Sequence, residues 1–264
     1  MLLFIPFPAI DPIIFQIGPI AIKWYGLSYA IGLILGIYYL KKMASLGSKV
    51  ISGADADDFL TWACLGVILG GRIGYVLFYN FFYYLDNPIY IFYVWQGGMS
   101  FHGGFLGVIA AGIIFSYKRK IPLLRFSDMV VCVVPIGLFF GRISNFINQE
   151  LVGRVTDVWW GMVFPKIGPE PRHPSQLYEA ILEGMILFLI TNFVWRSNSM
   201  REKQGLTSGI FVGGYGLFRM VIEFFRQPDE HIGYLSFGST LGQWLSLPMI
   251  CLGGCLIIFS RRNR

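Results

Sequence analysis

Long apolar stretches alternate with short polar breaks along most of the chain. Seven stretches are each about 20 residues long, the length that an α-helix needs to cross the hydrocarbon core of a membrane. They are Ile20–Leu40, Phe59–Phe81, Gly97–Tyr117, Met129–Ile147, Leu177–Trp195, Thr207–Phe225 and Leu241–Phe259. The pattern predicts an all-α, polytopic membrane protein with seven transmembrane helices in one transmembrane domain, residues 1–264. Prolines interrupt the apolar stretch Phe4–Gln16, which predicts an interfacial segment instead of a span.

Composition supports a membrane protein and argues against soluble classes. Apolar residues make up 55% of the 264 residues, and only 14% are charged. A soluble domain usually has about 25% charged residues, and a disordered chain has far fewer aromatic residues than the 17% found here. The net charge of +6 therefore bears on membrane orientation, and no nucleic-acid partner is expected.

The positions of Lys and Arg predict the orientation. One set of alternate loops carries 13 of these residues and the other set carries 5. Because cytoplasmic loops are enriched in Lys and Arg, the N-terminus is expected outside and the C-terminus in the cytoplasm. The longest polar segment, residues 148–175 between spans four and five, is then an extracytoplasmic segment. We expect a small outer domain or a lid at the membrane surface there.

Glycines recur at four-residue intervals within several spans, which predicts close packing of helices in lipid. The pairs and triplets are Gly32/Gly36, Gly66/Gly70/Gly74, Gly103/Gly107, Gly137/Gly141 and Gly209/Gly213.

Several polar residues lie where a membrane makes them costly. An ionisable group near the middle of the bilayer costs at least about 2.5–3.5 kcal/mol, so each one calls for a structural or functional reason. With the predicted orientation, Tyr25, Arg72, His102, Arg142 and Arg219 all fall in the outer halves of their spans. This shared depth predicts one polar site that opens toward the outer leaflet.

Local spacing groups some of these residues on common helix faces. Tyr215, Arg219 and Glu223 follow one another at intervals of four, so Arg219 and Glu223 are expected to pair. Arg142, Asn145 and Glu150 share a face if the fourth helix continues past residue 148. For Arg72, and for Glu179 with Glu183, the simplest expectation is a structural ion pair between helices.

Two arginines at one depth suit a phosphate, because a planar guanidinium binds phosphate through two parallel hydrogen bonds. A phosphate at this depth belongs to a phospholipid headgroup. The histidines show no metal-ligand spacing, and the chain has neither a P-loop nor a nucleophile-elbow motif, so neither a metal nor a cofactor is expected.

At these residues the sequence resembles the bacterial prolipoprotein diacylglyceryl transferases, over essentially its whole length. Four segments carry the resemblance: Gly97–Gly104 (GGMSFHGG), Gly141–Arg154 (GRISNFINQELVGR), His173–Glu179 (HPSQLYE) and Tyr215–Arg226 (YGLFRMVIEFFR). Ser144 stands where the family often has another small residue.

The resemblance implies a reaction in the bacterial cytoplasmic (inner) membrane, with the active site at its outer leaflet. The diacylglyceryl group of phosphatidylglycerol is transferred to the lipobox cysteine thiol of a preprolipoprotein, and glycerol 1-phosphate is released. Implied catalytic residues are His102, Tyr25, Arg142, Asn145, Glu150 and Arg219. Implied lipid-binding residues are Arg142, Arg219, Gly153, Tyr215 and Glu223.

Two routes to an active thiolate stay open. His102 has the intrinsic pKa of a general base, and Arg219 is an alternative that would lower the pKa of the thiol electrostatically. Glu150 is expected to orient Arg142, and Tyr25 to hydrogen-bond the headgroup.

Two other classes of function fit the sequence less well than the transferase. A transporter or flippase for a phospholipid or small anion should carry charge near mid-membrane, and the inner halves of these spans are nearly free of charge. A glycine-packed scaffold would not explain Arg142, Asn145 and Arg219 at one depth.

Overall fold

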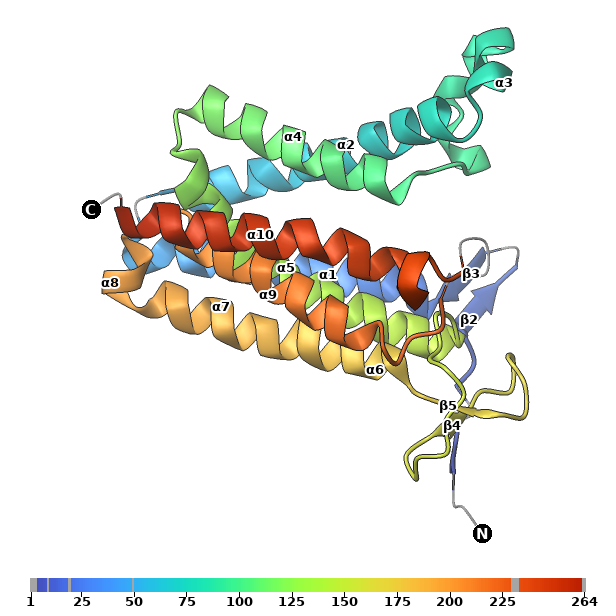
Figure 1. Cartoon of the computed structure of the whole chain (residues 1–264). Coiled ribbons are helices and arrows are strands. Elements are labelled where there is room, and N and C mark those ends of the chain that lie inside the picture. The colour runs from blue at the N-terminus through green and yellow to red at the C-terminus, as the bar shows by residue number, and fades with distance from the viewer. Residues whose placement is uncertain (1–3, 9, 19, 49, 229–232, 263–264) are drawn as a thin grey trace. The chain divides into compact units, whose positions relative to one another are not determined.

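The computed structural model describes residues 4–8, 10–18, 20–48, 50–228 and 233–262. The chain is mainly helical (Figure 1) and packs as two compact units. Unit 1 comprises Met1–Tyr38 and Asp128–Arg264, and unit 2 comprises Tyr39–Ser127. Lys49 and Arg264, which contribute to the charge count above, lie outside the described residues.

Each of the seven apolar stretches coincides with a long helical segment, so the mainly α-helical class is confirmed. Five segments are long and apolar enough to cross a membrane, whereas α9 is shorter. That all seven cross, with the N-terminus outside, stays a prediction. The segments are α1 (Trp24–Met43), α2 (Gly53–Phe78), α4 (Phe101–Arg119), α5 (Leu123–Asn148), α9 (Leu206–Ile222), α10 (Leu241–Arg262) and a composite helix, Ser175–Arg196. The composite helix consists of α6 (Ser175–Glu179), a π-helical stretch η4 (Ala180–Ile186) and α7 (Leu187–Arg196).

Several helix boundaries differ from the predicted spans. Gly97 and Gly98 have positive φ angles of 87° and 78°, so α4 begins only after Ser100, whose hydroxyl accepts a hydrogen bond from the Gly103 amide at 3.2 Å. Phe81 opens a separate short helix, α3 (Phe81–Asp86), followed by the 3₁₀ turns η2 (Pro88–Phe92) and η3 (Val94–Gln96). Another short helix, α8 (Asn198–Arg201), precedes α9.

Short strands form where the apolar pattern predicted none. Strands β2 (Ile13–Ile17) and β3 (Ile20–Lys23) pair in antiparallel fashion directly before α1, so this helix begins later than predicted. A second sheet has the order β1–β4–β5 and joins β1 (Ile5–Pro6) to β4 (Met162–Val163) and β5 (Pro171–Arg172).

The segment 148–175 is folded against the end of α5. Phe146 of α5 packs with Val152, Met162 and Phe164 in a buried cluster, and Phe7 joins its edge. Burial of these side chains fixes the exit of the chain from α5, so the polar residues at that end have a defined position. The extracytoplasmic location of the segment stays a prediction.

Glycine packing is confirmed at several helix pairs. In unit 2, a Cβ on Gly74 of α2 would lie 2.8 Å from the Cα of Gly103 of α4, so only glycine permits this backbone approach. In unit 1, a Cβ on Gly209 of α9 would lie 2.9 Å from the Gly253 carbonyl oxygen of α10, and α9 and α10 run side by side in Figure 1.

Arg72 contradicts the ion-pair prediction. Its buried guanidinium donates hydrogen bonds to backbone carbonyls of the segment that links α3 to α4, including those of Ile91 (2.8 Å) and Gly97 (2.6 Å). The group also lies 5.1 Å from the ring centroid of Tyr84. Backbone carbonyls of an irregular segment, instead of a carboxylate, accept the hydrogen bonds of the Arg72 guanidinium. The spacing of residues in the sequence does not predict such partners. Further carbonyl partners are those of Gly98, Tyr90 and Tyr93.

We expect Arg72→Leu to unfold this linking segment locally. The substitution leaves several carbonyls without their donor, and each buried unsatisfied group costs about 1–3 kcal/mol. Limited proteolysis of the purified protein should show faster cleavage within residues 87–98. The exposed Arg119→Leu variant provides the control. Equal cleavage rates for Arg72→Leu and the wild type would contradict the role of Arg72 as an anchor.

In unit 1, polar contacts hold the helices in register. Asp128 at the start of α5 accepts hydrogen bonds from the amides of Gly205 and Ser208, each at 2.7 Å, and so caps the first turn of α9. Asn192 of α7 donates to the Cys132 carbonyl of α5 at 3.1 Å. The helices α5, α7 and α9 are therefore fixed against one another at one end, which sets the side chains that meet at the other end.

Candidate functional site

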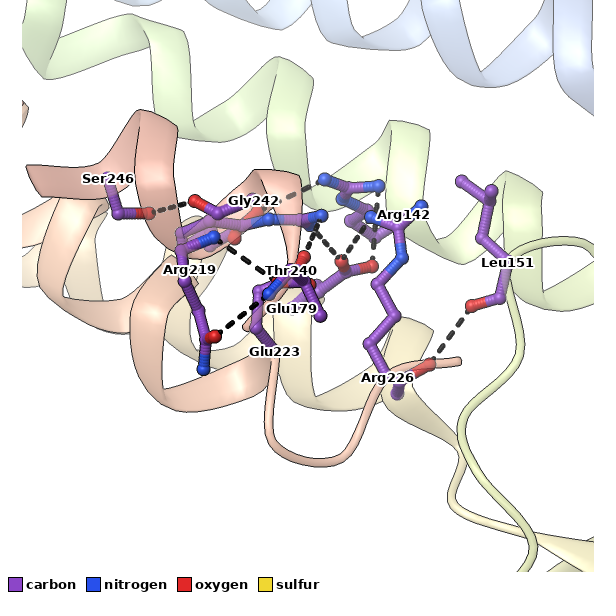
Figure 2. Close-up of polar contacts among 12 residues, drawn as sticks. Arg142, Leu151, Glu179, Arg219, Glu223, Arg226, Thr240, Gly242 and Ser246 are labelled. Carbon is purple, nitrogen blue, oxygen red and sulfur yellow. Dashed lines mark hydrogen bonds and ion pairs between the residues drawn. The ribbon is translucent and has the colours of Figure 1, made fainter. Parts of the chain in front are cut away.

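Arginines and glutamates from three helices of unit 1 meet in one buried network. Arg142 of α5 contacts two carboxylates of the composite helix: its Nη1 lies 3.3 Å from Glu179 Oε2, and its Nη2 lies 3.3 Å from Glu183 Oε2. Both glutamates are fully buried, and 16% of the Arg142 side chain is exposed. The network is drawn in Figure 2.

Arg219 of α9 reaches the same carboxylate from the other side. Its Nη1 lies 2.6 Å from Glu179 Oε1, and its Nη2 pairs with Glu223 one turn further along the chain. The predicted Arg219–Glu223 pair is therefore confirmed. Arg142 and Arg219 also share one partner, Glu179, as the common depth of the two residues suggested.

Residues at the start of α10 contact the carboxylate of Glu223. Thr240, directly before α10, donates its hydroxyl hydrogen to Glu223 Oε2 at 2.6 Å. A Cβ on Gly242 would lie 2.5 Å from Glu223 Cδ, so α10 leaves space for this carboxylate only because residue 242 is glycine.

A third arginine completes the network. Arg226, just beyond α9, lies 3.6 Å from Glu179 Oε1 through its Nη1. Its backbone carbonyl accepts a hydrogen bond from Arg154 at 2.9 Å, and Arg154 also donates to the Glu223 carbonyl at 3.0 Å. Arg154 therefore fixes the backbone at the end of α9.

Gly153 has a structural reason of its own. Its amide donates to the His173 carbonyl at 2.9 Å, and a Cβ there would lie 2.7 Å from the Phe225 carbonyl oxygen. The residue joins the segment after α5 to the segment after α9, which gives glycine a structural reason at this position. Its predicted contact with the lipid stays a prediction.

Asn145 and Glu150 lie together, but not as predicted. Helix α5 ends at Asn148, and Gln149 and Leu151 have positive φ angles of 60° and 55°, so the helical face does not continue to Glu150. Asn145 still donates to Glu150 Oε2 at 3.4 Å. The expectation that Glu150 orients Arg142 is not supported, because the ion pairs of Arg142 go to Glu179 and Glu183.

Tyr25 and Tyr215 lie at the edge of the network. Tyr25, near the start of α1, is half-exposed, has its hydroxyl 3.3 Å from that of Tyr29 and lies within electrostatic reach of Arg142 and Glu150. Tyr215 of α9 lies within electrostatic reach of Arg142, Arg219 and Glu183. Both residues lie near Arg142, and their roles in binding a headgroup stay predictions.

His102 belongs to the other unit. It lies on an exposed face of α4 in unit 2, with its ring at the edge of Phe101. Its part in the chemistry stays a prediction from the family resemblance.

A second histidine lies beside the network in unit 1. His173 Nδ1 is 3.1 Å from the Tyr178 hydroxyl, which also accepts a hydrogen bond from the Trp160 indole at 2.7 Å. Burial lowers the pKa of His173 below its usual value, so the ring is neutral near pH 7. The folded form therefore resists protonation of His173, and this residue contributes a loss of stability as the pH falls below its unfolded-state pKa.

Sequence reasoning assigned no functional role to four members of the network. Glu179 and Glu183 were expected as structural ion pairs, which is confirmed, but their arginine partners were not identified. The sequence predicted no specific role for Arg226 or for Thr240. The signal for the glutamates was available: two carboxylates four residues apart in an apolar helix require cationic partners.

The arrangement can bind an anion. Three guanidinium groups meet three carboxyl groups here, yet Arg142 and Arg219 each keep part of their side chain exposed. An approaching phosphate can use those guanidinium edges while the glutamates hold the groups in place. Among the described residues there is no cluster of three or more His, Cys, Asp or Glu side chains that could hold a metal ion.

Comparison with known proteins identifies relatives along the entire chain. The protein from Paramagnetospirillum magneticum named phosphatidylglycerol–prolipoprotein diacylglyceryl transferase is 55% identical over 258 residues, which cover 97% of this chain and 96% of the relative. Proteins of the same name from Rhodospirillum rubrum and Rickettsia africae are 53% and 52% identical, with 100% and 95% of this chain covered and 97% of each relative. Residues 12–259 match the family described as prolipoprotein diacylglyceryl transferase, and the chain therefore belongs to that family.

Proposed function

We propose that the Arg–Glu network of unit 1 holds the phosphate of phosphatidylglycerol during diacylglyceryl transfer. The protein is a multi-pass bacterial membrane enzyme that transfers a diacylglyceryl group in lipoprotein maturation, as its relatives are named. The observation that carries the proposal is the meeting of Arg142 and Arg219 on one carboxylate, Glu179. This contact holds two guanidinium groups side by side in a site largely closed to water.

The reaction places specific demands on such a site. The thiol sulfur of the lipobox cysteine forms a bond to C3 of the glyceryl group, and the bond between that carbon and the phosphate oxygen breaks. The thiol proton ends on the released glycerol 1-phosphate, so the charge balances. Negative charge develops on the leaving phosphate in the transition state, where fixed cations in a low-dielectric site stabilise it most.

Arg142 and Arg219 are suited to this role because their partners pre-organise them. Glu183 and Glu179 fix one guanidinium, and Glu179 and Glu223 fix the other. Little reorganisation is then needed when charge develops. The base for the thiol is either His102 or a route in which Arg219 stabilises the thiolate, and the site is proposed to face the outer leaflet of the inner membrane.

Lipid retention tests where the phosphate binds. Protein purified in detergent is loaded with phosphatidylglycerol or phosphatidylethanolamine, and bound lipid is counted by native mass spectrometry. Phosphatidylglycerol should remain bound to the wild type, and Arg219→Gln should retain at least about tenfold less, because a charge-assisted hydrogen bond contributes about 1.5–3 kcal/mol. Retention by Arg219→Gln equal to that of the wild type would place the phosphate elsewhere.

A further inference from the structure

Two carboxylate oxygens of the network lack a hydrogen-bond donor. Among the described residues, Glu179 Oε2 and Glu183 Oε1 are buried and accept no hydrogen bond, and both side chains are fully buried. Glu179 Oε2 has only the ion-pair contact to Arg142 at 3.3 Å. Buried acceptors without a donor are rare in proteins and cost about 1–3 kcal/mol each, more when they are charged.

Both oxygens belong to one short stretch of chain. Glu179 ends α6, Glu183 lies four residues on within η4, and Arg142 contacts the other oxygen of Glu183 as well as Glu179 itself. Two carboxylates that face one arginine in a closed site repel each other if both are ionised. The charged and titratable groups around the pair are Arg142 on α5, Tyr215 and Arg219 on α9, and Glu223 and Arg226 just beyond α9.

We propose that Glu179 and Glu183 hold one proton between them, so that Glu183 Oε1 carries the hydrogen and donates it to Glu179 Oε2. One proton satisfies both oxygens at once. Glu183 Oε2 still accepts from Arg142 at 3.3 Å, and Glu179 Oε1 still accepts from Arg219 at 2.6 Å, so both hydrogen bonds to arginine are retained. Paired carboxyl groups that share a proton are a known response to close like charges.

The shared proton changes the charge of the site. With every glutamate ionised, the three arginines and three glutamates of the network sum to zero. With one proton on the Glu179–Glu183 pair, the network carries a single positive charge. This charge complements a phosphodiester with one negative charge, the chemistry of the phosphatidylglycerol headgroup. The effect of this charge on lipid binding rests on the proposed function, whereas the presence of the shared proton does not.

Infrared spectroscopy of the protein in lipid nanodiscs detects the proton directly. A protonated carboxyl group gives a carbonyl stretch that is distinct from that of a carboxylate and shifts in deuterated water. At neutral pH the wild type should show this band, Glu183→Gln should lose it, and Glu170→Gln should keep it because Glu170 is exposed and outside the network. Absence of the band from the wild type, or a band unchanged in both Glu183→Gln and Glu179→Gln, overturns the proposal. Two ionised glutamates bridged by a water molecule would give that negative result.

The KM for phosphatidylglycerol tests the consequence. Above the pH at which the pair loses its proton, the KM of the wild type should rise tenfold per pH unit, because lipid binding is then linked to the uptake of one proton. The KM of Glu183→Gln should show no such rise, because its amide keeps an N–H donor that does not titrate. An identical alkaline rise in Glu183→Gln would contradict the linkage. A positive infrared result with no phosphatidylglycerol binding by the wild type would instead reject the proposed function and leave the shared proton standing.

Discussion

Arg142→Ala is expected to lower diacylglyceryl transfer at least about 100-fold, the usual effect of removing one pre-organised electrostatic group from an active site. The side chain contacts Glu179 and Glu183 and keeps 16% of its surface exposed, where a phosphate can reach it. The measurement uses purified protein, phosphatidylglycerol and a lipobox peptide, with the thioether product quantified by mass spectrometry.

This substitution also removes the ion-pair partner of Glu183, whereas Glu179 keeps Arg219 and Arg226. Breaking a buried ion pair costs about 3–5 kcal/mol in stability. Arg142→Lys separates the two effects because it keeps the charge and loses the planar fork. We expect it to fold as the wild type does and still to transfer at least about tenfold more slowly, since a point charge cannot hold two carboxylates and a phosphate together.

Arg201→Ala is the matched control. Arg201 also belongs to unit 1, and its guanidinium lies over the Trp195 ring at 5.3 Å, outside the network. Its removal should not change the rate of transfer. A wild-type rate for Arg142→Lys would show that only the charge matters and would remove the geometric part of the argument.

Glu179→Gln is expected to be the second most damaging change. Glu179 is the one carboxylate of the network that contacts all three arginines, Arg142, Arg219 and Arg226 (Figure 2). Its neutral amide cannot balance them, and breaking a buried ion pair costs about 3–5 kcal/mol. Loss of alignment at Arg142 and Arg219 should reduce kcat by at least about 100-fold, because small misplacements of catalytic groups have effects of this size.

The experiment records thermal unfolding in detergent together with kcat and the KM for phosphatidylglycerol. Glu170→Gln makes the same chemical change at an exposed site, 3.7 Å from Arg172, and should leave both measurements unchanged. If Glu179→Gln unfolds at a lower temperature than the wild type but transfers at the wild-type rate, then Glu179 only stabilises the fold and does not position the arginines.

The sequence predicted the parts of this site that depend on regular helices. The apolar stretches located all seven long helical segments, and the four-residue spacing on α9 predicted the pairing of Arg219 with Glu223. The depth argument placed Arg142 and Arg219 together, and the structure shows them on one carboxylate.

The parts that depend on irregular backbone were not predictable in the same way. Arg72 is bound by carbonyls of the segment between α3 and α4, and any residue type supplies a carbonyl. Glu150 lies beyond the end of α5 because Gln149 and Leu151 adopt left-handed conformations that neither residue type signals. The partners of Glu179 come from two other helices, so only tertiary packing identifies them.

The length of the π-helical stretch η4 sets the rotation of α7 relative to α6 within the composite helix. Glu179 precedes this stretch, whereas Asn192, which binds the Cys132 carbonyl, follows it on α7. A chain with one residue deleted from η4 would turn every later side chain by about 100° relative to Glu179. Such a protein could keep the contacts of Glu179 or those of Asn192 but not both. A change in the length of η4 should therefore be more damaging than substitution of its side chains other than Glu183, which pairs with Arg142.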